Sequence, residues 1–123
     1  MTREEKAVQY KHSGYNCCQA VVLAMADLTE VDEETLCKMS SGFAAGMGCM
    51  EATCGSLIGA TMIAGLMKNG TGTVSTASKI HKQFKECSGA TICKDIKGRD
   101  TGEILCECDD CVRNAVRALE SLV

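Results

Sequence analysis

The 123-residue sequence contains no proline and no tryptophan, and aromatic residues make up only 3% of it. Because proline interrupts helices and stiffens linkers, its absence leaves long helices uninterrupted and excludes proline-dependent turns. The scarcity of aromatic side chains removes the stacking platforms on which single-stranded nucleic acids bind. A formal net charge of −3 also provides no overall cationic field. We therefore expect no nucleic-acid partner.

Long apolar runs are missing as well. The longest stretch without a charged residue, Ala52–Met67, has 16 residues and three glycines, whereas a membrane-spanning helix needs about 20 apolar residues. Glu4 and Glu5 stand where a secretory signal would carry an apolar run. We therefore predict a cytoplasmic protein with no membrane partner. The length predicts one domain over residues 1–123.

Cysteine, in contrast, is abundant, with ten residues in this short chain. A chain of this length buries roughly two-thirds of its unfolded surface, so its core needs no cross-links. Structural disulfides are also rare in the cytoplasm. We therefore interpret the cysteines as residues for metal binding or redox chemistry.

The pattern of apolar residues predicts helices only. Apolar residues recur at intervals of three and four, and no stretch alternates at period two. Thr2 with Glu5, and Asn16 with Gln19, form capping boxes that mark the first two helix starts. The sequence thus predicts an all-α fold, a single-domain compact helical bundle of about five or six helices with a glycine-rich central segment between Ser40 and Gly55. The expected helices run from Thr2 to before Gly14, from Asn16 to about Leu28, from Asp32 towards Phe43, from Gly55 to Lys68, from Val74 to Glu86, near Cys93–Ile96, and onwards from Asp109 or Asp110.

Three cysteines are expected at helix N-termini. Cys17 follows the Asn16 cap, Cys54 leads into the fourth helix, and Cys111 lies in the first turn of the last. Open backbone N–H groups and the helix dipole stabilise a thiolate at such positions. The same N–H groups would favour an anionic cluster of thiolates and sulfide. Cys37 and Cys87 fall on apolar stripes, where we expect ordinary packing.

Other cysteines leave further sites open. Cys106, Cys108 and Cys111 form the densest group, and the last two make a C-x-x-C pair. A c-type haem would require histidine where Val112 stands, and a thioredoxin-like pair would require a βαβ context. A structural zinc or metal-buffering module remains compatible with this group. Cys49 is separated from Cys54 by a glycine-flanked turn, and it is a further candidate ligand.

The remaining motifs say little about catalysis. No Gly-x-Ser-x-Gly, phosphate-binding loop or dinucleotide-binding glycine pattern is present, so nothing indicates a hydrolase or a nucleotide enzyme. Any enzymatic activity would be of the oxidoreductase type. A local basic stretch is either a solvated helix face or a docking surface for an acidic redox partner; its residues are Lys79, Lys82, Lys85, Lys94, Lys97 and Arg99.

Several segments together resemble a known family. Gly14–Cys17, Cys54–Ala60 and Ser88–Cys93, followed by the late Cys111 before Val112, are similar to the C-GCAxxG-C-C family of bacterial proteins, which is regarded as redox-active. The resemblance covers about residues 5 to 120. Ser56 stands where the family motif carries alanine.

The resemblance implies a site and a cofactor. The family's four cysteines correspond to Cys17, Cys54, Cys93 and Cys111, with Gly55 and Gly59 beside them. A related domain in split-Soret cytochromes carries an iron–sulfur centre of the two-iron type within a dimer. The resemblance therefore implies a homodimer with a 2Fe-2S cluster.

Three hypotheses follow. In the first, the four family cysteines bind an iron–sulfur or related metal cluster for electron transfer or storage. In the second, some of them cycle as metal-free thiols and disulfides. In the third, zinc binds to a structural module formed by Cys106, Cys108 and Cys111.

Overall fold

Capping boxes fix the first two helix starts, as the sequence predicts. The Thr2 hydroxyl accepts a hydrogen bond from the Glu5 N–H (3.1 Å), and the Glu5 carboxylate accepts one from the Thr2 N–H (3.3 Å). Asn16 and Gln19 form the same reciprocal pair, at 2.9 and 3.0 Å. Each pair satisfies two N–H groups that would otherwise lack a partner near a helix start.

A computed structural model describes residues 1–123. The all-α prediction is confirmed, because no strand is present and extended backbone pairs only in an isolated bridge between Thr53 and Ile92. Seven α-helices are present, one in each of the seven segments for which the sequence predicts a helix, although the bundle was expected to contain about five or six. The elements are α1 (Arg3–His12), α2 (Cys17–Ala24), the 3-10 turn η1 (Ala26–Leu28), α3 (Glu33–Met39), the π turn η2 (Gly46–Met50), α4 (Gly55–Met67), α5 (Thr73–Ser88), α6 (Cys93–Lys97) and α7 (Cys108–Glu120).

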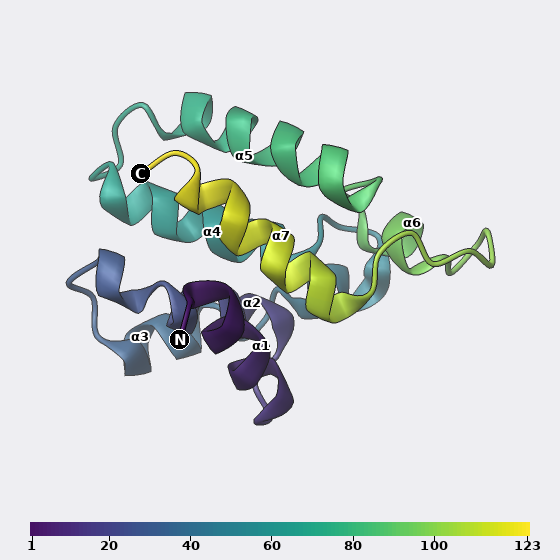
Figure 1. Ribbon diagram of the computed structural model, residues 1–123, viewed down its shortest axis with the longest axis horizontal. Coiled ribbons are helices and arrows are strands. Elements are labelled where there is room, and N and C mark those ends of the chain that lie inside the picture. The colour runs from purple at the N-terminus through teal and green to yellow at the C-terminus, as the bar shows by residue number, and fades with distance from the viewer.

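Helices α4 and α7 pack against each other at the centre of the molecule (Figure 1). Helix α5 contacts both of them from one side, and α2 contacts both from another side. Helices α1 and α3 pack against α2. Helix α6 and the loop that follows it project at one end of the bundle (Figure 1). None of the helices is both long and apolar enough to cross a bilayer.

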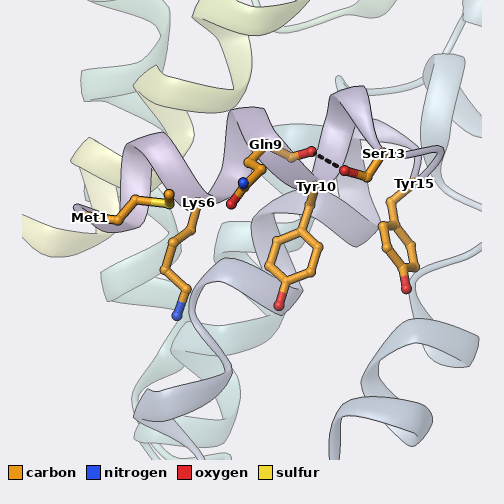
Figure 2. Close-up of a pocket in the computed structure, with 6 residues that line it drawn as sticks. All are labelled: Met1, Lys6, Gln9, Tyr10, Ser13 and Tyr15. Atoms are coloured by element: carbon orange, nitrogen blue, oxygen red, sulfur yellow. Dashed lines mark hydrogen bonds between the residues drawn. The ribbon is translucent and has the colours of Figure 1, made fainter.

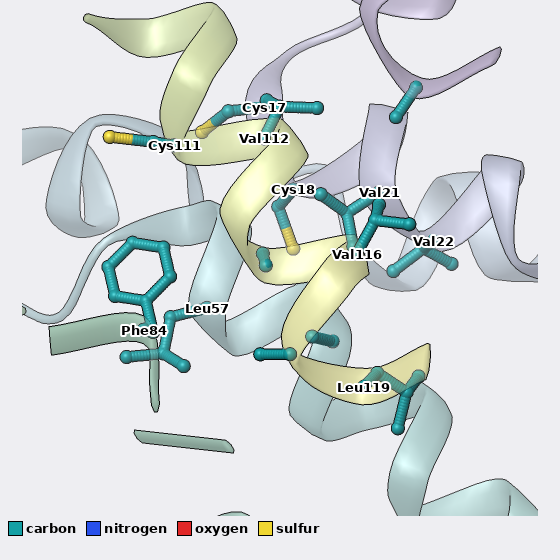
Figure 3. Packing of buried hydrophobic residues seen from close by; sticks show 14 of the residues in the cluster. Cys17, Cys18, Val21, Val22, Leu57, Phe84, Cys111, Val112, Val116 and Leu119 are labelled. Carbon is teal, nitrogen blue, oxygen red and sulfur yellow. The ribbon is translucent and has the colours of Figure 1, made fainter. Parts of the chain in front are cut away.

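The core is one cluster of 23 buried residues to which all seven α-helices contribute. Helix α2 is buried on nearly every side, as its apolar sequence predicts. Phe84 of α5 and Val116 of α7 are fully buried in the same cluster (Figure 3). Gly59 lets α2 and α4 approach closely, because a Cβ there would lie only 3.0 Å from the Cys18 carbonyl oxygen.

Two helix ends differ from the sequence-based expectation. The second helix ends at Ala24, and the chain continues as η1 instead of a regular helix to Leu28. The last helix was expected to begin at Asp109 or Asp110, but it begins at Cys108. Leu122 continues the apolar spacing of this helix, but it is exposed because the helix ends at Glu120.

Cys87 is exposed, so its expected place on an apolar stripe is wrong. The buried residues of α5 are Ile80, Phe84 and Ser88, which follow one another at every fourth position. A stripe with that spacing leaves Cys87 rotated away from the core. The sequence alone did not show which of the two spacings, three or four, continues to the end of the helix.

Candidate functional site

The starts of α4 and α6 are held side by side by the bridge between Thr53 and Ile92. The Cys54 N–H donates to the Thr91 carbonyl oxygen (2.8 Å), and the Cys93 N–H donates to the Ala52 carbonyl oxygen (3.0 Å). Cys54 caps α4 and Cys93 is the first residue of α6. The bridge therefore brings together two cysteines that are far apart in the sequence.

The turn before α4 closes over this bridge. Gly46, with a positive φ of 56°, packs so tightly that a Cβ on it would lie 2.8 Å from the Cys93 Cβ and 2.9 Å from the Ala52 carbonyl oxygen. Three non-glycine residues of the same segment, Ala45, Met47 and Met50, also have positive φ. Such backbone is costly for residues with a side chain. The segment is thus held in an unusual conformation directly against the cysteines.

Cys17 reaches the same place from the start of α2. A Cβ on Gly55 would lie 2.9 Å from the Cys17 Sγ and 2.8 Å from the Phe43 carbonyl oxygen. Only a residue without a side chain allows the Cys17 sulfur to lie against the first turn of α4. Gly55 therefore belongs to the site, whereas Gly59 lies further along α4 and packs against α2.

Helix α7 contributes two more sulfurs from its first turn. The Cys108 side chain lies next to that of Cys17, and the Cys111 side chain lies next to that of Cys54. Figure 3 shows Cys17 and Cys111 at the same end of the buried cluster, away from Leu119. The structure thus gathers the four cysteines that the family resemblance implied, together with Cys108, which was expected only in the alternative metal-binding group.

A cavity of about 280 Å³ opens beside these sulfurs. Four cysteines line it, each from a different helix start: Cys17, Cys54, Cys93 and Cys108. Cys111 does not line it and is completely buried. In this structure, Cys108 therefore occupies the cavity-facing position that the resemblance led us to expect for Cys111. The C-x-x-C spacing places both residues on one face of a helix, but it does not indicate which of them faces the cavity.

The close approach of the two thiols makes the members of each pair unequal. The neighbouring Cys111 thiol, helped by the open N–H groups of the α4 N-terminus, lowers the pKa of Cys54 to about 6. The neighbouring Cys17 thiol lowers the pKa of Cys108 to about 6 as well. The pKa values of Cys17 and Cys111 are raised, first by the paired thiol and then by burial, so the thiolate expected at these two helix starts is not favoured there. One thiol of each pair thus ionises readily near neutral pH.

A lysine ammonium group lies among the sulfurs. The Lys97 Nζ donates to the Cys106 carbonyl oxygen (3.3 Å) and to the Cys111 Sγ (3.7 Å), and its side chain lines the cavity. Burial lowers the pKa of Lys97, but the sulfurs of Cys111 and Cys108 raise it, and the net direction is upward. Lys97 was interpreted from sequence as part of a basic surface stretch. The structure turns it inward instead.

The first turn of α4 also carries a polar group without a partner. The Ser56 side chain is completely buried, and its Oγ makes no hydrogen bond. It lies next to the Cys54 sulfur. A buried hydroxyl without a partner is uncommon and calls for a specific explanation.

The other candidate ligands lie outside this cavity. Cys49 is exposed, and its thiol donates to the Gly46 carbonyl oxygen (3.4 Å). Cys106 lines a separate cavity, where its sulfur accepts from the Asn114 Nδ2 (3.7 Å). Cys106, Cys108 and Cys111 thus do not face a common point. No three His, Cys, Asp or Glu side chains are close enough together in this structure to surround a single metal ion.

A larger cavity, of about 520 Å³, lies on α1 and contains no cysteine (Figure 2). Tyr10 and Tyr15 meet edge to face there, with 5.5 Å between ring centroids, and the Ser13 hydroxyl donates to the Gln9 carbonyl oxygen (2.8 Å). Lys6 is the one charged residue in its lining. This cavity offers no thiolate ligands, so the cysteine-lined cavity is the candidate redox site.

Residues 15–122 match the family model described as "Putative redox-active protein (C_GCAxxG_C_C)", and the chain belongs to this family. The resemblance drawn from the sequence is thereby confirmed. Comparison with curated proteins and with solved structures gave no match.

Proposed function

We propose that this protein transfers or stores electrons by means of an iron–sulfur cluster bound in the cysteine-lined cavity. The observation that supports the proposal is the meeting of Cys17, Cys54, Cys93 and Cys108 around one cavity, next to the ammonium group of Lys97. The family's description as redox-active points to the same chemistry. A protein with this role would act together with a redox partner, and we propose a homodimer as its assembly.

The residues around the cavity fit such a group. Thiolates are the usual ligands of iron–sulfur clusters, and N–H groups near the sulfurs help to set the potential. Cys54 stands at the N-terminus of α4, where such N–H groups are open. Gly55 lines the cavity at a point where the Cβ of any other residue would collide with neighbouring atoms. The Ser56 hydroxyl makes no hydrogen bond, so its proton is free to be donated to a sulfur atom. When bound, a two-iron cluster would supply one-electron redox chemistry.

The ligands we propose are Cys17, Cys54, Cys93 and one cysteine from the first turn of α7. The family resemblance assigns this fourth position to Cys111, whereas the lining of the cavity favours Cys108. Cys108 and Cys111 are three positions apart in α7, so they lie on the same face of the helix. Comparison of Cys108→Ser with Cys111→Ser decides between them, because only the ligand variant should lose iron.

The test is anaerobic reconstitution of the full chain with iron and sulfide under argon. We expect a brown protein with about two iron and two sulfide per chain, since four thiolates hold a two-iron cluster. Cys17→Ser, Cys54→Ser and Cys93→Ser should each lose most of this iron. Cys37→Ser is the matched control, because Cys37 is half-buried and lies away from the cavity. A wild-type protein that stays colourless contradicts the proposal, and bound zinc in place of iron would favour a zinc site.

The paired thiols favour a second candidate function, metal-free thiol–disulfide exchange. In each pair, a thiol of lowered pKa lies next to a thiol of raised pKa. This combination suits a nucleophile with a second thiol beside it. Thiol titration of metal-free protein before and after mild oxidant tests this function. A reversible loss of two thiols without bound metal supports it, and an unchanged thiol count contradicts it.

A further inference from the structure

The ammonium group of Lys97 has no carboxylate partner. Eight ion pairs are present in the structure, and none of them includes Lys97. Its Nζ instead contacts the Cys111 sulfur at 3.7 Å and the Cys106 carbonyl oxygen at 3.3 Å. The negative charges available to it are therefore those of the surrounding thiolates.

The backbone holds Lys97 in this position from both sides. Lys97 is the last residue of α6, and the chain reverses immediately afterwards through Gly98, whose φ of 71° is in the left-handed region. The Leu105 N–H then donates to the Ile96 carbonyl oxygen (2.8 Å), which ties the segment before α7 to α6. The side chain thus spans the gap between the end of α6 and the first turn of α7.

We propose that Lys97 is the charge-compensating residue of the cluster site and raises the reduction potential of the bound cluster. This inference rests on the proposed function. Reduction adds one electron to the cluster, so the negative charge beside Lys97 increases while no bond to Lys97 forms or breaks. A nearby cation stabilises the more negative, reduced state more than the oxidised state. The half-buried position limits screening by salt, so the effect persists at physiological ionic strength.

Redox titration of the reconstituted protein, with dithionite as reductant and the electron paramagnetic resonance signal as readout, tests the inference. Lys97→Met keeps a long side chain but removes the charge, and Lys97→Arg keeps the charge. Lys94→Met removes a charge from the same helix, at a residue that does not line the cavity. We expect Lys97→Met to shift the reduction equilibrium about tenfold towards the oxidised cluster, which is about 59 mV for one electron. Lys97→Arg and Lys94→Met should stay close to the wild type.

The possible outcomes separate this inference from the proposed function. Equal potentials in the wild type and Lys97→Met, at full iron content, overturn the role of Lys97 and leave the cluster proposal intact. A wild type without a cluster overturns both. Loss of the cluster in Lys97→Met with retention in Lys97→Arg supports charge compensation, whereas loss in both variants contradicts it. Circular dichroism of each variant establishes that the helices have formed.

Discussion

Three glycines of α4 provide a graded test of how tightly the cysteine site is built. A Cβ on Gly55 would lie 2.8 Å from the Phe43 carbonyl oxygen, 2.9 Å from the Cys17 Sγ and 3.1 Å from the Ala44 Cα. Two of these three contacts are with backbone atoms, which cannot rotate away. Gly55→Ala therefore requires the segment before α4, or α2, to move.

The control lies in the same helix. A Cβ on Gly65 would meet only the Thr73 Cγ2, at 3.8 Å, which is an ordinary contact. Gly65→Ala should therefore stabilise the protein by about 0.5–1 kcal/mol, because alanine loses less backbone entropy in a helix than glycine. Gly59→Ala should fall between the two variants, since its Cβ would lie 3.0 Å from the Cys18 carbonyl oxygen.

For Gly55→Ala the steric cost should exceed the helix gain. Forcing an extra methyl group into a packed site costs about 1–3 kcal/mol, so we expect a net loss of roughly 1–2 kcal/mol in the free energy of unfolding after the helix gain is subtracted. Urea denaturation of the wild type, Gly55→Ala and Gly65→Ala, followed by circular dichroism, measures the difference. The displaced Cys17 sulfur should also lower the iron content after reconstitution. If Gly55→Ala is as stable as Gly65→Ala and binds as much iron, the tight contact at Cys17 is not required.

Three further predictions concern the core, the buried hydroxyl and the surface. Phe84→Ala should lower the free energy of unfolding by about 3–5 kcal/mol, because the ring is fully buried; a loss below 1 kcal/mol in urea denaturation would contradict this packing. Ser56→Ala should raise the free energy of unfolding of the metal-free protein by about 1 kcal/mol, because it removes a buried hydroxyl without a partner. Ser40→Ala is its control, since the buried Ser40 hydroxyl donates to the Leu36 carbonyl oxygen (2.6 Å), and equal effects of both would refute the reasoning. Arg3→Ala should lower the free energy of unfolding by about 1 kcal/mol or less, because Arg3 makes two partly exposed ion pairs, with Asp27 and with Glu120. The loss should be smaller still at high salt, which screens these pairs. If thermal unfolding at low salt is the same with and without Arg3, the two pairs do not contribute to stability.

Features that depend on neighbouring residues could be read from the sequence. The capping boxes at Thr2 and Asn16 determine where α1 and α2 begin, because the bonds that form them span only three residues. The all-α fold follows in the same way from the spacing of apolar residues. The place of Cys54 at a helix N-terminus was also predictable, because the fourth helix was expected to begin at Gly55, the next residue.

Which cysteines meet, and which side chains face the cavity, was decided by the tertiary structure alone. Cys93 reaches Cys54 through a bridge between Thr53 and Ile92, a pairing between distant segments that no local pattern encodes. Lys97 looks like a surface lysine in the sequence, yet it points among the sulfurs because the chain reverses at the end of α6. Which of Cys108 and Cys111 faces the cavity depends on how α7 is rotated against α4, and packing of the whole core sets that rotation. The sequence thus determined the helices and the supply of thiols, while long-range packing selected the thiols that form the site.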